Sequence, residues 1–238
     1  VLPPPYQPVR LADGRVSLLN RSLHFAASGL PDSLQSNGIE LLAAPMRLVA
    51  GIAGREVELT GEAPAELLAS DDTRLELGNS GKLGDAISVA LRSRSEADGC
   101  IQFFLDLTAD RETRLDNLTL QLPLRRAIAR YWMGMEKRGG KRQGALDWQW
   151  NGQYLNNLIW VGDVQAGVQL KLQSAEDTWA LWALPLDPAM LWAGGGCRSE
   201  ENGDTLTLLA DTGSFTLQPG KSRSLRFRLL LTPFKPID

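Results

Sequence analysis

Hydrophobic and polar residues alternate one by one through much of the chain. In residues 118–124, leucine occupies every second position, with threonine, glutamine and proline between. Alternation with a period of two places one face of a strand on a core and the other face in water. The pattern predicts strands at residues 15–19, 22–27, 73–77, 87–91, 118–124, 168–172, 206–209 and 225–229.

Short polar turns separate the predicted strands, for example at residues 200–204 and 211–213. No stretch keeps the 3.6-residue period of a long amphipathic helix, and residues 64–69 predict one or two helical turns at most. Strands this short and this numerous are typical of sandwiches. We therefore predict an all-β protein, a large antiparallel two-sheet β-sandwich.

The domain organisation follows from the proline-rich ends. Residues 1–12 contain VLPPPYQP and predict a stiff, extended linker. Residues 13–232 are expected to form the sandwich domain, because no repeat and no break in composition divides them. Residues 233–238 are expected to begin a linker to a following domain. Both ends indicate a domain taken from a longer protein.

Composition narrows the class of partner. Hydrophobic residues make up 43% of the chain and charged residues 22%, which is enough to build a core. The net charge of −3 argues against a nucleic-acid partner. No apolar run approaches the roughly 18 residues of a membrane span. We therefore expect neither a nucleic-acid nor a membrane partner.

Few residues suit metal or nucleophilic chemistry. His24 is the only histidine, and it lies out of phase with the apolar Leu23 and Phe25. Cys100 and Cys197 form no metal-binding motif, and they are either a disulfide or two buried thiols. The chain has no nucleophile elbow and no phosphate-binding glycine motif. We expect no cofactor, no metal and no catalytic residue.

All seven tryptophans lie between Trp132 and Trp192. Trp148 and Trp150 have polar neighbours, including Asp147, and are the candidates for a carbohydrate or domain-interface role. An aromatic face beside a carboxylate is a reasonable sugar contact, although tryptophans on strands also pack in cores. Three further tryptophans lie in apolar runs and are expected to pack: Trp160, Trp179 and Trp182.

A basic segment lies beside these tryptophans. Residues 125–142 contain seven basic residues and one acid, Glu136. Arg138, Arg142 and Glu136 join the candidate carbohydrate or interface site, in a glycine-rich loop at residues 136–144. Lys137, Arg138, Lys141 and Arg142 are expected to find acidic partners outside this segment, either in a neighbouring acidic domain or on an acidic glycan. The alternative is a solvated, mobile turn.

Several stretches, taken in order, resemble one known family. They are Gly29-Leu30-Pro31 leading to Ser36-x-Gly38-x-Glu40-Leu41-Leu42, residues 118–124, Tyr131-Trp-Met-Gly-Met135 with Gly139-Gly140, Trp160-Val-Gly-Asp163 with Ala166-Gly167, and residues 231–236. Together they are similar to the N-terminal β-sandwich domain of bacterial glycoside hydrolase family 123 proteins. The resemblance implies a sandwich of the galactose-mutarotase-like supersandwich kind and an extracellular or periplasmic location.

The resemblance also implies where catalysis occurs. In that family a (β/α)₈ barrel follows the sandwich, and an adjacent Asp-Glu pair in the barrel supports substrate-assisted hydrolysis of N-acetylgalactosamine linkages. This chain contains no Asp-Glu dipeptide and no alternating strand–helix pattern. No catalytic residue can therefore be carried over.

These observations predict a non-catalytic β-sandwich module of a glycoside-hydrolase-like protein. Its partners would be the C-terminal catalytic barrel of the same polypeptide and a glycan, whose cleft it helps to frame. Two alternatives stay open: an autonomous carbohydrate-binding module, and a sugar-active enzyme of epimerase or lyase type.

Overall fold

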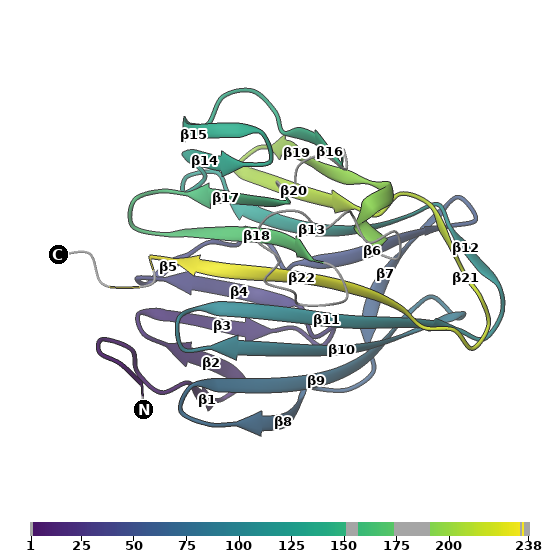
Figure 1. Ribbon diagram of the computed structural model, residues 1–238, viewed down its shortest axis with the longest axis horizontal. Helices are drawn as coiled ribbons and strands as arrows, with labels where there is room; N and C mark the ends of the chain where they lie inside the picture. Colours follow the sequence, from purple (N-terminus) through teal and green to yellow (C-terminus); the bar gives the residue numbers. More distant parts are fainter. Residues whose placement is uncertain (1, 151–156, 174–190, 234, 236–238) are drawn as a thin grey trace.

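The computed structural model describes residues 2–150, 157–173, 191–233 and 235, and it is a two-layered antiparallel β-structure (Figure 1). The eight strands predicted from alternation are all present, which confirms the all-β fold class. The helical part of these residues is one short 3₁₀ turn, η1 (Leu191–Gly194). It follows that they contain no helix able to span a membrane.

The first layer is one long run of neighbouring antiparallel strands. In order it contains β15 (Lys137–Lys141), β14 (Tyr131–Gly134), β17 (Leu158–Gly162), β18 (Gly167–Gln173), β22 (Arg223–Thr232), β11 (Cys100–Ala109), β10 (Ile87–Glu96), β9 (Arg74–Leu83) and β8 (Glu66–Ser70). The neighbours include strands far apart in sequence, such as β22 between β18 and β11.

The second layer lies behind the first in Figure 1 and combines two groups of strands. One group contains β7 (Arg55–Gly61), β6 (Arg47–Ile52), β13 (Asn117–Arg125), β20 (Thr205–Asp211), β19 (Gly196–Asn202) and β16 (Asp147–Gln149). The other contains β1 (Arg10–Ala12), β2 (Arg15–Leu18), β3 (Arg21–Phe25), β4 (Pro31–Ser36) and β5 (Ile39–Glu40). A bridge between Leu42 and Leu124 connects the two groups. A separate pair, β12 (Thr113–Leu115) with β21 (Phe215–Leu217), completes the strands.

Strand β7 carries the chain from one layer to the other, because it pairs with β6 and also with β9. Gly61 and Gly81 face each other in the β7–β9 ladder. A Cβ atom at Gly61 would lie 1.6 Å from the carbonyl oxygen of Ala27, and one at Gly81 would lie 2.5 Å from that of Thr60. Only glycine permits this close backbone approach.

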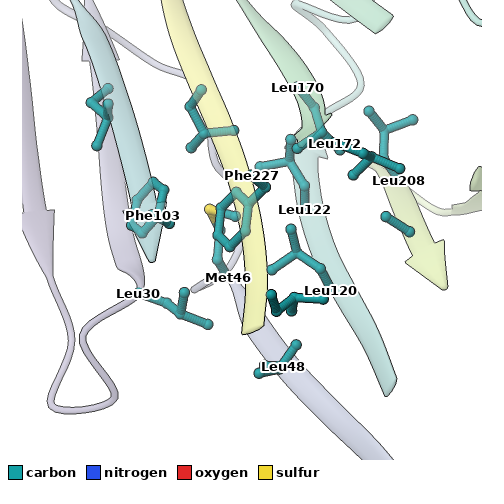
Figure 2. Close-up of a cluster of buried hydrophobic side chains, with 14 of the residues drawn as sticks. Leu30, Met46, Leu48, Phe103, Leu120, Leu122, Leu170, Leu172, Leu208 and Phe227 are labelled. Atoms are coloured by element: carbon teal, nitrogen blue, oxygen red, sulfur yellow. The ribbon is translucent and has the colours of Figure 1, made fainter. Parts of the chain in front are cut away.

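A single hydrophobic core fills the space between the layers. Phe103 of β11 and Phe227 of β22 stack with ring centroids 4.5 Å apart, and Phe25 of β3 meets Phe103 edge-on at 6.4 Å. Figure 2 shows Leu and Met side chains gathered around the two stacked rings. Because side chains alternate along each strand, the residues next to Phe103 and Phe227 lie on the opposite face of the first layer.

The structure corrects two expectations. Residues 64–69 form no helical turn, because β8 pairs with the edge of β9 and satisfies its backbone groups there. A bulge between Leu67 and Ala69 lets Leu68 lean over Gly78, which has no side chain. The linker expected at residues 1–12 is also too long, since Arg10–Ala12 pairs with β2 as strand β1.

Candidate functional site

The basic segment forms a hairpin at one edge of the first layer. Strands β14 and β15 pair through Tyr131 with Lys141 and Trp132 with Gly140. The turn passes through Met135 and the exposed Glu136, whose φ angles are 43° and 66°. The glycine-rich loop expected at residues 136–144 therefore contains a strand that is hydrogen-bonded to the sheet.

Arg142 is directed back into the domain. Its Nε donates a hydrogen bond to the carbonyl of Ala129 at 2.8 Å, and its guanidinium pairs with Glu201 of β19. The hydrogen bond from Arg142 and its charge lower the pKa of Glu201. Arg142 also lies 5.9 Å from the ring centroid of Trp132. The expectation that Arg142 seeks an acidic partner in another domain is therefore wrong, because β19 supplies one.

The other three cations of the hairpin differ in their contacts. Lys137 donates to the carbonyl of Ala145 at 2.8 Å and lies 5.0 Å from the centroid of Trp132. Arg138 and Lys141 are exposed and have no acidic partner within the described part of the chain. Met133, on the neighbouring strand, is 53% exposed. The outer surface of the hairpin thus combines an apolar side chain with two cations that have no acidic partner among the described residues.

Trp148 is only 2% exposed and belongs to the core. Trp150 is half-buried and packs on that core, with the two indoles perpendicular and 4.9 Å apart. The expected exposed role is therefore corrected for Trp148, whose ring has no free face for a sugar. The reason is the alternation of β16, in which Asp147 and Gln149 point outward and Trp148 points inward.

The other tryptophans within the described ranges also pack. Trp132 and Trp192 are buried, and the indole of Trp160 donates to the hydroxyl of Thr232 at 2.9 Å. Trp179 and Trp182, which were expected to pack, lie outside the described residues. The six predicted site residues consequently share no single face: the Trp148 ring lies in the core, while Asp147, Arg138 and Glu136 are exposed.

A different surface gathers charged and polar side chains, on the outer face of the first layer. We call it the arginine face, and define it by Glu76, Arg92, Arg94, Gln102, Phe104, Asp106, Arg226 and Arg228. One row across five strands contains Glu76, Arg94, Gln102, Arg228 and Lys171 as successive register partners. The next row contains Arg92, Phe104, Arg226 and Gln173. The two rows lie on the face of the sheet opposite the core face, which carries Phe103 and Phe227.

The ring of Phe104 holds three guanidinium groups in place. The guanidinium carbon of Arg92 lies 4.3 Å from the ring centroid, that of Arg226 lies at 5.4 Å and that of Arg94 at 5.7 Å. A cation near an aromatic face is attracted to it by roughly 0.5–2 kcal/mol, more when the cation is desolvated. Phe104 therefore limits the motion of three long side chains.

Two carboxylates lie among these cations. Glu76 accepts hydrogen bonds from Arg94 at 2.8 Å and from Arg92 at 3.2 Å. Burial acts to raise the pKa of Glu76, but the hydrogen bonds and charge of the two arginines outweigh it, and the pKa falls below 4.5. Burial also acts to raise the pKa of Asp106, but the hydrogen bonds from Ser224 and Arg226 lower it. Both groups are therefore ionised near neutral pH.

Arg228 differs from its neighbours because no carboxylate of the described residues pairs with it. One terminal nitrogen lies 3.4 Å from the amide oxygen of Gln169, and its buried Nε has no hydrogen-bond partner there. The buried Nε of Arg226 is likewise without an acceptor, although its terminal nitrogens are paired. A buried donor without an acceptor costs roughly 1–3 kcal/mol, and more when charged.

The sequence prediction missed the arginine face because it used only the apolar positions of each alternating strand. The signal is present in Arg92-x-Arg94 and Arg226-x-Arg228, where the polar positions of two strands carry the same charge. Alternation places each pair on one face of its own strand. It does not show that β10, β11 and β22 are neighbours.

Neither the lone histidine nor the two cysteines supply a reactive group to the hairpin or to the arginine face. His24 contacts Asp32 through Nδ1 at 2.7 Å on the outer face of β3. Cys100 and Cys197 are both free thiols, and burial raises the pKa of each to about 12. Thiols this weakly acidic are poor nucleophiles at neutral pH. No group of His, Cys, Asp or Glu within the described ranges is arranged to hold a metal ion.

Several solved structures with the same fold belong to proteins that are named for activities on carbohydrates. The chain is similar to heparan sulfate lyase from Pedobacter heparinus, with a TM-score of 0.56, 6% identity, and 99% of this chain matched to 38% of that one. Galactose 1-epimerase from Lactobacillus acidophilus NCFM gives a TM-score of 0.53 at 7% identity, with 95% and 97% covered. A galactose mutarotase related enzyme from Lactobacillus acidophilus gives 0.51 at 7% identity, with 96% and 98% covered.

At these identities the likeness concerns the fold alone, which is that of galactose-mutarotase-like sandwiches. A family model supplies the closer assignment: the model for the third domain of glycoside hydrolase 123 matches residues 9–233. The chain belongs to this family, and it is a carbohydrate-related sandwich domain of a multidomain group. The model describes a third domain, whereas the resemblance implied an N-terminal one. No curated protein sequence matches the chain.

Proposed function

We propose that the chain is a non-catalytic sandwich domain of a glycoside hydrolase, and that its arginine face lines the carbohydrate cleft beside the catalytic barrel of the same protein. The observation that carries the proposal is the arginine face itself. Four guanidinium groups and the amide of Gln102 lie within two adjacent rows of one sheet. Planar charged and amide groups of this kind are the donors that hydroxyl, carboxylate and sulfate groups accept from.

The protonation of the carboxylates supports a non-catalytic role. Hydrolysis by two carboxyl groups needs one of them to carry a proton near neutral pH, which requires a raised pKa. Arginine contacts lower the pKa of both Glu76 and Asp106 instead. The two acids are therefore suited to hold arginines in position, and poorly suited to protonate a leaving group.

The outer surface of the β14–β15 hairpin is the side that we propose to pack on the barrel. Arg138 and Lys141 are exposed without acidic partners among the described residues, and Met133 is exposed beside them. An arginine next to an apolar anchor is a frequent source of interface energy. Asp147, Trp150 and Glu136 are proposed as contributors at the margin of that contact, and Arg142 stabilises the hairpin from within.

Steady-state kinetics of the intact multidomain protein test this proposal. Arg228→Gln should raise KM for the glycan substrate by about tenfold while kcat changes less, because a binding contact far from the reacting bond is lost. Arg55→Gln is the matched control, since it removes an exposed guanidinium of β7, away from both the arginine face and the hairpin. An unchanged KM in the Arg228→Gln protein would refute the cleft assignment.

The isolated chain should neither hydrolyse aryl N-acetylhexosaminides nor interconvert sugar anomers. Product analysis and polarimetry measure these two activities. Turnover that is lost in Glu76→Gln or Asp106→Asn would show that the domain is an enzyme. An autonomous carbohydrate-binding module is the second candidate, favoured by Arg228, which pairs with no carboxylate of the described residues. Tight binding of glycan by the isolated chain would support it.

A further inference from the structure

We infer that the ligand of the arginine face is an anionic glycan, whose carboxylate or sulfate groups are held between Arg228 and Arg94. This inference rests on the proposed function, because it names the class of sugar that the same surface would bind. It depends on the balance of charge, on one guanidinium that has no carboxylate partner among the described residues, and on the rigidity of the neighbouring side chains.

The face carries more positive than negative charge. Arg92, Arg94, Arg226 and Arg228 lie in its two rows, against Glu76 in the first row, Asp106 just beyond the second row, and Glu96 at the end of β10, opposite Arg74. Glu76 and Asp106 are already paired with arginine, as the hydrogen bonds from Arg94 and Arg226 show. Glu66 of β8 lies at the margin, opposite Gly78 and two strands from Arg92. The described residues therefore leave an excess of guanidinium groups.

The excess is concentrated at Arg228. Its register partners are Gln102 on β11 and Lys171 on β18, so the nearest neighbours in its row are an amide and a cation. Among the described residues its terminal nitrogens have one acceptor, the amide oxygen of Gln169 at 3.4 Å. A ligand oxyanion would accept hydrogen bonds from the remaining terminal N–H groups of this half-buried side chain, and charge-assisted hydrogen bonds of this type are about twice as strong as neutral ones.

The cations next to Arg228 are held in position before a ligand arrives. Glu76 fixes Arg94, Asp106 and two backbone carbonyls fix Arg226, and Phe104 lies against both. Ordering a free arginine side chain on binding costs conformational entropy. Because this ordering is already present in the folded protein, less of the binding free energy is lost to it. Neutral sugars use hydroxyl groups and have no need for such a concentration of guanidinium groups.

Calorimetric titration of the 238-residue chain with matched oligosaccharides tests the inference. The probes are a uronic acid oligosaccharide, its carboxyl-reduced neutral counterpart, and a sulfated oligosaccharide without uronic acid. We expect binding of at least one anionic probe, weakening as salt is added, and at least about tenfold weaker binding of the neutral counterpart. Which anionic probe binds more tightly distinguishes a carboxylate from a sulfate ligand.

Variants locate the site. Arg228→Gln and Arg94→Gln should each weaken binding of the anionic probe by about tenfold or more, and Arg228→Lys should have an intermediate effect because it keeps the charge but loses the planar fork. Arg138→Gln is the control and should bind as the unmodified chain does. Circular dichroism should show that each variant is folded.

Other outcomes would overturn the inference. Equal binding of the neutral and acidic probes would leave the proposed function standing and exclude an anionic ligand. Binding that is lost equally in Arg138→Gln would reflect general charge, as would equal affinity for single-stranded DNA. If none of the probes binds, the inference is wrong, while the KM of the intact Arg228→Gln protein still decides the proposed function separately.

Discussion

Replacing Trp148 by alanine should destabilise the domain strongly, although its sequence neighbours are polar. The indole is 2% exposed and meets Trp150 at right angles, with 4.9 Å between ring centroids. Removing a buried aromatic ring leaves a cavity and costs about 3–5 kcal/mol. About 0.5–1.5 kcal/mol of the effect would come from the lost contact between the rings. We therefore expect Trp148→Phe, which keeps an aromatic ring, to be the milder change.

Urea unfolding followed by far-ultraviolet circular dichroism measures the effect without relying on tryptophan fluorescence. A loss of about 3–5 kcal/mol corresponds to a melting temperature lower by roughly 6–20 °C for a domain of this size. Arg138→Ala is the control, because a change at an exposed side chain without an acidic partner should stay within about 0.5 kcal/mol. If Trp148→Ala unfolds at the same urea concentration as the control, the ring does not lie in the core and the assignment of β16 is wrong.

Two further predictions concern titratable groups. Because the pKa of Glu76 is lowered in the folded state, its stabilisation is present above the usual carboxyl pKa of 4.5 and is lost as the pH falls through the lower folded-state value. The difference in unfolding free energy between the unmodified chain and Glu76→Gln should therefore shrink from pH 7 to about pH 3, and a constant difference would contradict the paired geometry. Burial raises the pKa of Cys100 and of Cys197 to about 12, so both thiols should resist iodoacetamide at about pH 8 in the native chain and react after unfolding in urea. Mass spectrometry counts the adducts. Rapid labelling of the native chain would show that a thiol is accessible.

The basic hairpin shows how far charge alone supports a functional assignment. The sequence showed seven basic residues near a single acid, which indicated partners in another domain. Glu201 is 59 residues away from Arg142 in the sequence, yet the two pair because β19 lies next to the hairpin in the fold. Arg138 and Lys141 remain without an acidic partner among the described residues. Only these two cations still support the original argument.

The sequence by itself determined the fold class, part of the secondary structure and the family. Period-two alternation identified eight strands, because a strand between core and solvent must alternate whatever its neighbours are. The order of short motifs, each weak alone, indicated the family that the match over residues 9–233 confirms. The error at residues 64–69 falls on an edge strand that pairs with β9 and is exposed throughout. A strand of that kind has no alternation to reveal it.

The tertiary structure decided which residues form a surface together. Trp148 and Arg142 have polar neighbours in the sequence but face inward. The alternation of β16 places Trp148 in the core, and the ion pair with Glu201 directs Arg142 toward β19. Glu76, Arg94 and Arg228 are spread over more than half of the chain, and they share a row because β9, β10, β11 and β22 are neighbours in the sheet. Strand order and register depend on long-range pairing and on how the whole core packs. A local pattern shows on which face of its own strand a side chain lies, but not which side chains lie beside it.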